Sequence, residues 1–204
     1  NNVLQGKATL HADNVAPYEL IRPYMTWNWN GPSLETMSKS EKDALNASWA
    51  SLLDFGSDED MLAVVDTSGS MHSSYGLPAA VALSLGLYLA EHNKGRFRNH
   101  FIEFSEHPQL IRLKGETFVD KLRYILTFDE IADTNLEAVF QLILCVAVKN
   151  KLPQKELPGK LVIISDMEFN VCVTNASETN FENARRRYEA YGYKLPEIVF
   201  WNVG

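Results

Sequence analysis

The chain has 204 residues, of which 46% are hydrophobic and 22% charged, and its net charge is −7. This composition can bury a core and excludes a disordered chain, while the acidic balance excludes a dedicated nucleic-acid binder. Two cysteines, Cys145 and Cys172, are too few for a disulfide scaffold, so we expect a cytoplasmic protein. The apolar run 77–90 is too short to span a bilayer. We therefore expect no membrane contact, and we expect a monomer.

The first 57 residues are predicted to form an N-terminal helical extension, followed by a larger domain at 58–204. The stretches "NVAPYELIRPYM" and "SLETMSKSEKDALNASWASLLDFG" both carry apolar residues at helical spacing. In the second stretch Ser33 and Gly56 are the expected helix caps. The tryptophans of this region are interpreted as anchors that hold the extension in place, with a nucleobase platform as the alternative: Trp27, Trp29 and Trp49.

Strands and helices alternate from Met61 onward. The runs "MLAVVD", "KLVIISD" and "EIVFWNV" are continuously apolar, as in strands that are covered on both faces. "HFIEFS" and "QLIRL" lie so close together that only a tight turn can join them, which predicts an antiparallel pair at a sheet edge. Helices are predicted at 77–92, 116–126, 135–150 and 180–191. The pattern predicts an α/β, doubly wound, Rossmann-like sheet, mostly parallel with one antiparallel edge strand.

Two of the predicted strands end in an aspartate, Asp66 and Asp166. In a doubly wound sheet these strands lie side by side where the winding direction reverses, and ligands bind there. Two unpaired carboxylates at that point would repel and raise each other's pKa, and a cation between them removes that cost. Hydroxyls at Ser68 and Ser70 add oxygen donors that suit Mg²⁺, Mn²⁺ or Ca²⁺. Gly69 is expected to let the loop turn tightly enough to aim both serines inward.

The sequence "DTSGSM" at 66–71 resembles the D-x-S-x-S motif of von Willebrand factor A domains, which carry a metal-ion-dependent adhesion site. That family adds a threonine from a later loop and an aspartate after the fourth strand, and "ADTNLEAVF" and "IISDMEF" supply both. The resemblance covers roughly residues 58–204. Where the family usually has small residues before the threonine, this chain has Ala132 and Asp133. The metal ligands that the resemblance implies are Asp66, Ser68, Ser70, Thr134 and Asp166.

A second resemblance links "LHADNVAPYELIRPYM", "SDMEF" and "YGYKLPEIVFWNV" to a family with a Ro-like A domain at its C-terminus. In Ro proteins that domain follows a helical-repeat module that binds RNA. The similarity implies an intracellular relative, in which RNA would be bound only through the intact protein.

Other readings of the same residues stay open at this point. An aspartic protease needs Asp-Thr-Gly, and a haloacid-dehalogenase phosphotransferase needs a second aspartate where Ser68 stands. Asp66 and the serines could also be a helix cap with a solvated turn, and Thr134 or Asp133 could cap the helix from Asn135. Further roles considered for neighbouring residues are an extra metal ligand at Asp133, a base or ligand at His72, and ligand contacts at Glu168 and Asn170. Contacts to RNA or phosphate are considered for Arg185, Arg186 and Arg187. The favoured alternatives are an exposed loop position for His72 and a solvated helix face for the arginines.

The function that these observations favour is a binding module and not an enzyme. A divalent ion, Mg²⁺ or else Mn²⁺ or Ca²⁺, would complete its coordination shell with an acidic group of a partner protein. The alternatives are a Ro-like ribonucleoprotein component and, less favoured, a metal-dependent phosphoesterase, for which the sequence offers no convincing general acid or base.

Overall fold

A computed structural model describes residues 15–25, 30–52, 59–128, 135–168 and 177–204. Its strands are β1 (Met61–Asp66), β2 (His100–Phe104), β3 (Gln109–Arg112), β4 (Lys160–Ser165) and β5 (Glu197–Asn202). They form one sheet in the order β3-β2-β1-β4-β5. Only β2 and β3 pair antiparallel, and the other neighbours are parallel. The predicted α/β sheet, mostly parallel with one antiparallel edge strand, is therefore confirmed.

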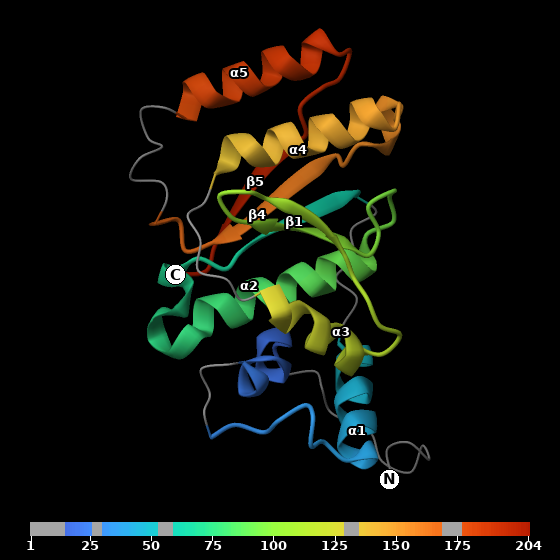
Figure 1. The fold of residues 1–204 in the computed structure, drawn as a ribbon, viewed down its shortest axis with the longest axis vertical. Coiled ribbons are helices and arrows are strands. Elements are labelled where there is room, and N and C mark those ends of the chain that lie inside the picture. The colour runs from blue at the N-terminus through green and yellow to red at the C-terminus, as the bar shows by residue number, and fades with distance from the viewer. Residues whose placement is uncertain (1–14, 26–29, 53–58, 129–134, 169–176) are drawn as a thin grey trace.

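Helices cover both faces of this sheet (Figure 1). One face carries α2 (Ser73–His92) and α3 (Phe118–Ile125), and the other carries α4 (Leu136–Lys149) and α5 (Ser177–Ala190). Successive residues of a strand point to opposite faces, so Ala63 and Val65 of β1 join the cluster around α2, while Leu62 and Val64 join the cluster around α4. Burial on both faces explains why this strand is apolar as far as Asp66.

The described residues before β1 contain one α-helix and two short 3₁₀-helices. These are η1 (Pro17–Leu20), η2 (Arg22–Tyr24) and α1 (Lys39–Ala50). The predicted cap Ser33 is wrong, because Ser38 caps α1 through a reciprocal pair of hydrogen bonds with Glu41. Such a capping box satisfies two backbone groups at once, which a cap at Ser33 would not do. Gly56 lies outside the described residues.

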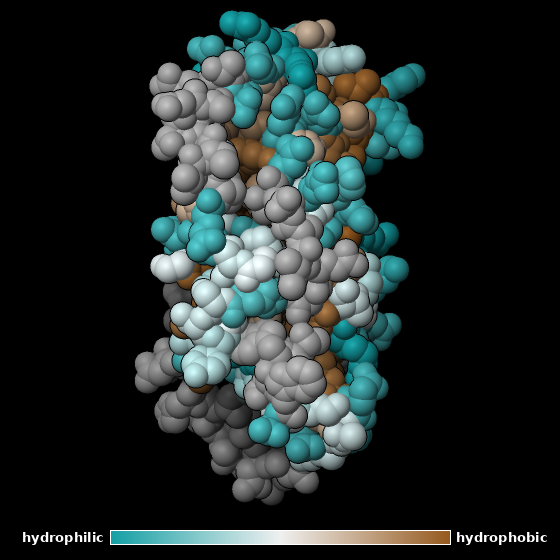
Figure 2. All heavy atoms as spheres, turned by 60° about the vertical axis from the view of Figure 1, so that its left-hand side comes forward, coloured by the Kyte–Doolittle hydropathy of each residue, from teal (hydrophilic) through white to brown (hydrophobic). Residues whose placement is uncertain are grey.

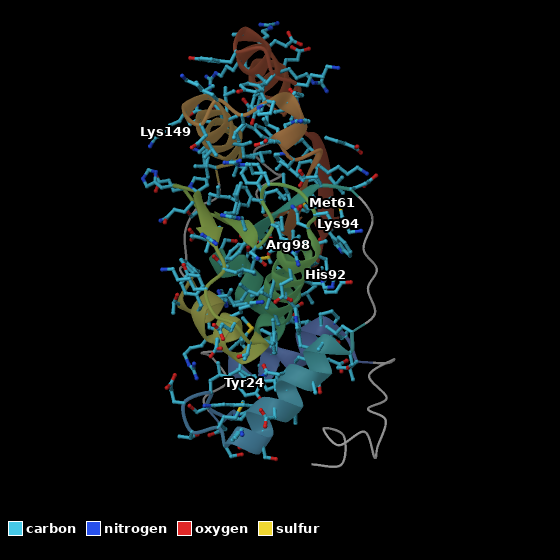
Figure 3. The ribbon with its side chains drawn as sticks, turned by 90° about the vertical axis from the view of Figure 1, so that its right-hand side faces the viewer. Tyr24, Met61, His92, Lys94, Arg98 and Lys149 are labelled. Carbon is cyan, nitrogen blue, oxygen red and sulfur yellow. The ribbon has the colours of Figure 1, made fainter. Side chains whose placement is uncertain are left out.

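The segment that holds these helices, residues 15–52, packs directly on α2 and α3. The ring of Trp49 stacks on Phe118 at 4.2 Å between centroids, and its Nε1 donates a hydrogen bond of 2.7 Å to Glu91. The same carboxylate accepts from Lys121 at 2.6 Å. These contacts confirm the anchoring role predicted for Trp49, whereas Trp27 and Trp29 lie outside the described residues. Figure 3 places Tyr24 of this segment near one end of the molecule, far from Lys149 at the end of α4.

The range of α2 begins four residues before the predicted helix at 77–92, but Ser74, Tyr75 and Gly76 have non-helical φ and ψ, so the regular helix has the predicted bounds. With the 3₁₀-helix before it, η3 (Gly69–His72), it forms a stretch that is long and apolar enough to cross a membrane by length and composition alone. Most of that stretch is buried inside the structure, between the sheet and residues 15–52. A helix covered on two sides needs apolar residues all round, so its place in the core accounts for its composition.

Candidate functional site

The carboxyl ends of β1 and β4 meet at the centre of the sheet. The chain continues from β1 to one side and returns to the other side at β4, so this is the point where the winding reverses. Val65 pairs with Ile164 in the register of the two strands. The next residues along, Asp66 and Ser165, therefore stand next to each other, and the loops that follow both strands leave from the same edge.

The carboxylate of Asp66 is buried, with 1% of the residue exposed. Its Oδ2 accepts a hydrogen bond of 2.5 Å from the Ser165 hydroxyl, and its Oδ1 accepts one of 2.9 Å from the Ser68 backbone N–H. Burial raises the pKa of Asp66, the hydrogen bonds oppose that rise, and the charge of Asp166 adds to it. From the sequence we expected repulsion between the two aspartates to raise the pKa of Asp66, but the loss of solvent around its carboxylate is the larger cause.

Ser165 is a site residue that sequence reasoning missed. The strand was expected to end on Asp166, but β4 ends one residue earlier. The side chain opposite Asp66 is therefore a hydroxyl that is itself fully buried. Its oxygen donates to Asp66 and accepts a hydrogen bond of 3.0 Å from the Met167 N–H. The signal was available only in the pairing register of β1 with β4.

The hydroxyls of Ser68 and Ser70 come together beside Asp66. Their Oγ atoms lie 3.2 Å apart, and both residues are half-buried. Gly69 between them begins η3, a 3₁₀-helix, and is not among the residues with positive φ. The tight turn expected at Gly69 is therefore a 3₁₀ turn, which needs only right-handed residues.

The left-handed residues of this loop come later, at Ser74, Tyr75 and Gly76, with φ of 52°, 55° and 64°. Tyr75 is also 84% exposed. A bulky residue is strained in this conformation, and such strain occurs often at ligand sites.

Asp166 stands at the same edge on the loop after β4. Its backbone N–H donates to the sulfur of the buried Met71 at 3.2 Å, which joins the loop after β4 to the loop after β1. Its Oδ1 accepts a hydrogen bond of 3.1 Å from the Glu168 N–H. The side chain is half-buried and close enough to Asp66 to raise the pKa of that residue.

The structure thus brings together four of the five predicted metal ligands, while Thr134 lies outside the described residues, as do Asp133 and Asn170. The cap of α4 is Asn135, whose side chain accepts from the Ala138 N–H at 3.0 Å, and the alternative that Thr134 or Asp133 caps this helix falls outside the described residues. The Asn135 N–H donates to the Ser105 carbonyl at 3.3 Å. Helix α4 therefore begins beside the carboxyl end of β2, at the site edge of the sheet.

The remaining predicted residues lie on η3, on the loop after β4 and on α5. His72 is half-buried in η3, and Glu168 is exposed on the loop after Asp166. The arginines at 185–187 are all exposed on α5, where Arg187 pairs with Glu137 at 2.8 Å. Within the described ranges no three His, Cys, Asp or Glu side chains gather in one place. The oxygen donors that the described residues of the site offer come from two carboxylates and several hydroxyls.

Comparison with known proteins places the chain in a family. Over 199 residues, 98% of the chain, it is 32% identical to "Uncharacterized protein L728" of Acanthamoeba polyphaga mimivirus. The chain spans 33% of the length of that relative, and the match includes most of the residues before β1. A family model, described as "Domain of unknown function (DUF7788)", matches residues 60–204, which contain the whole sheet and the candidate site. The chain belongs to the DUF7788 family.

Proposed function

We propose that the domain is a binding module of the von Willebrand factor A type, with a metal-ion-dependent adhesion site at the carboxyl ends of β1 and β4. One observation carries the proposal. The buried carboxylate of Asp66 lies beside two half-exposed hydroxyls, those of Ser68 and Ser70, whose oxygens are 3.2 Å apart.

The donor set fits a divalent cation. Two oxygens at right angles about 2.1 Å from Mg²⁺ are roughly 3.0 Å apart, and around the larger Ca²⁺ the separation is somewhat longer. Ser68 Oγ and Ser70 Oγ are hydrogen-bonded to each other at 3.2 Å, a separation close to this spacing. Carboxylate and hydroxyl oxygens suit Mg²⁺, Mn²⁺ or Ca²⁺ better than zinc. A cation would also offset the cost of keeping Asp66 charged in a buried position.

The residues would divide the work as the resemblance implies. Ser68 and Ser70 would bind the ion directly, joined by Thr134, while Asp66 and Asp166 would act mostly through waters. Ser165 orients Asp66 through its hydrogen bond, and Met71 holds the backbone of Asp166. Because hydroxyls are neutral, they leave much of the ion's charge uncompensated. That charge favours an acidic residue of a partner protein as the remaining ligand.

The first experiment tests the ion. Titration calorimetry with Mn²⁺ or Mg²⁺ should give one divalent ion per chain, and a hundredfold excess over Kd should stabilise the fold by about 2.7 kcal/mol. The variant Ser68→Ala/Ser70→Ala should lose this response. Ser73→Ala, an exposed serine of the same loop, should keep it. A double variant that binds the ion as tightly as the wild type would reject the site.

A second experiment tests the role. The purified protein with Mg²⁺ should not hydrolyse phosphoesters, nucleotides or peptides, because we propose a binding module and not an enzyme. A carboxylate-bearing peptide partner should be released by EDTA, since the ion forms part of the contact. A phosphatase rate that disappears in Asp66→Asn or Asp166→Asn, and survives further purification, would replace binding with catalysis.

A further inference from the structure

A groove with a volume of about 430 Å³ opens between α4 and α5. This size lies within the roughly 300–1,000 Å³ of typical ligand pockets. Its apolar lining comes from Leu144, Cys145 and Val148 of α4 and from Tyr191, the residue after α5. The structure therefore has a concave surface that none of the candidate site residues lines.

The lining is unusually apolar for an exposed surface. Val148 is 38% exposed and Tyr191 is 62% exposed. They are two of the five large hydrophobic residues that the described part of the chain leaves exposed. Figure 2 shows hydrophobic atoms reaching the surface in the upper part of the molecule, where Figure 1 places α4 and α5. Apolar surface gathered in a groove is typical of a docking site.

The charges of the groove differ in sign from those of the whole chain. The chain has a net charge of −7, yet the two charged residues that line the groove are the cations Lys149 and Arg187. Arg187 pairs with Glu137, which is not part of the lining. Lys149 ends α4 at the outer edge of the molecule (Figure 3). Complementarity of charge therefore favours an acidic partner.

The shape of the groove favours a helix as the occupant. Its wall on α4 runs over the nine residues from Gln141 to Lys149, about 12 Å along the axis, which matches two turns of another helix. The apolar face of an amphipathic helix fits a groove of this kind through side chains spaced three or four residues apart. We propose that the α4–α5 groove docks an acidic amphipathic helix of a partner protein, whose apolar residues cover Val148 and Tyr191 and whose carboxylates meet Lys149 and Arg187.

This surface is separate from the candidate metal site. Helix α4 begins beside that site, where Asn135 contacts the end of β2. Cys145 in the groove lies ten residues further on, about 15 Å along the helix. Docking in the groove should therefore not need a divalent ion.

The test uses a phage-displayed library of helical peptides, selected against the whole chain in EDTA. Enriched peptides should carry Leu, Ile or Phe at i, i+3 or i+4 spacing, flanked by Asp or Glu. By fluorescence anisotropy, Val148→Glu and Lys149→Glu should each weaken binding roughly tenfold or more, as expected for groove residues that contribute most of the affinity. Lys155→Glu, the same charge change at an exposed lysine outside the lining, should leave binding unchanged.

Several outcomes would overturn the proposal. These are a selection without acidic, amphipathic sequences, and binders that ignore both groove variants. Circular dichroism would show whether Val148→Glu folds. If Val148→Glu does not fold, a charge reversal replaces it: Lys149→Glu is tested with a peptide in which the acidic residue opposite position 149 is changed to Lys. If this peptide does not restore binding, the groove is not the docking site. Self-association in sedimentation that Lys149→Glu abolishes would assign the groove to a second copy of the chain instead.

Discussion

Replacing Asp66 with asparagine should stabilise the metal-free protein at neutral pH. Burial raises the pKa of Asp66, so the charged form is less stable in the folded protein than in the unfolded chain. For a carboxyl group of this kind, stability is lost as the pH rises from the unfolded pKa through the folded one. A neutral amide of the same shape avoids that loss. The advantage of Asp66→Asn should therefore be present at pH 7 and disappear below 3.8, the ordinary pKa of the group.

Addition of Mg²⁺ should reverse the order of the two proteins. A ligand at a hundredfold excess over Kd stabilises the folded state by about 2.7 kcal/mol. For a chain of this length each kcal/mol corresponds to about 2–4 °C. The wild type should therefore gain roughly 5–11 °C in melting temperature, while Asp66→Asn should gain nothing.

Differential scanning calorimetry in EDTA and in Mg²⁺ at pH 7, and in EDTA at about pH 3, where Asp66 is protonated even in the unfolded chain, measures both effects. Glu189→Gln, which removes one exposed negative charge from α5, is the control for net charge. If Asp66→Asn melted below the wild type in EDTA at pH 7, the hydrogen bonds to the carboxylate would outweigh its desolvation, and the reasoning would fail. An equal response of both proteins to Mg²⁺ would remove Asp66 from the metal site.

Three further predictions concern packing and strain. Trp49→Ala should lower the free energy of unfolding in urea by about 3–5 kcal/mol, because it removes the buried ring stacked on Phe118. A decrease of less than about 1 kcal/mol would mean that residues 15–52 contribute little to the core. Gly86→Ala should lower the free energy of unfolding by about 1–3 kcal/mol, since its Cβ would lie too close to a methyl group of Val65. Adding Val65→Ala should restore part of that free energy, and no recovery would mean that the new methyl group clashes with another residue. Tyr75→Gly should raise the free energy of unfolding by about 1 kcal/mol, because glycine adopts a left-handed φ without strain. Tyr75→Ala should not raise it, and equal melting temperatures for the two variants would argue against strain at this position.

Much of the fold could be predicted because burial on both faces leaves a direct trace in the sequence. The strand 61–66 was predicted with its observed bounds, and the antiparallel pair followed from the short connection between "HFIEFS" and "QLIRL". Asp66 could be picked out because a charge at the end of an apolar strand is conspicuous. These are local signals, and each needs only a few neighbouring residues.

The features that could not be predicted depend on contacts between residues far apart in the sequence, or on a choice between two residues with equal local propensity. Ser165 meets Asp66 across 99 positions, and only the register of β1 with β4 shows that the hydroxyl, not the following aspartate, faces it. Ser33 and Ser38 are both acceptable helix caps, and the decision came from the reciprocal bond with Glu41. The α4–α5 groove depends on how two helices pack, which no periodicity in either helix reveals.

Residues 15–52 cover α2, so we expect them to belong to the same cooperative folding unit as the sheet. The family match begins at residue 60, but Ile21, Met25 and Trp49 belong to the same buried cluster as Val65 and Leu87. A polypeptide that began at residue 60 would leave the outer side of α2 open to water. We expect such a fragment to aggregate, and in the full chain we expect the amides of α1 and α2 to exchange hydrogen with similar protection, as parts of one cooperative unit. The start of the family model and the thermodynamic boundary that we expect for this domain therefore fall at different places in the sequence.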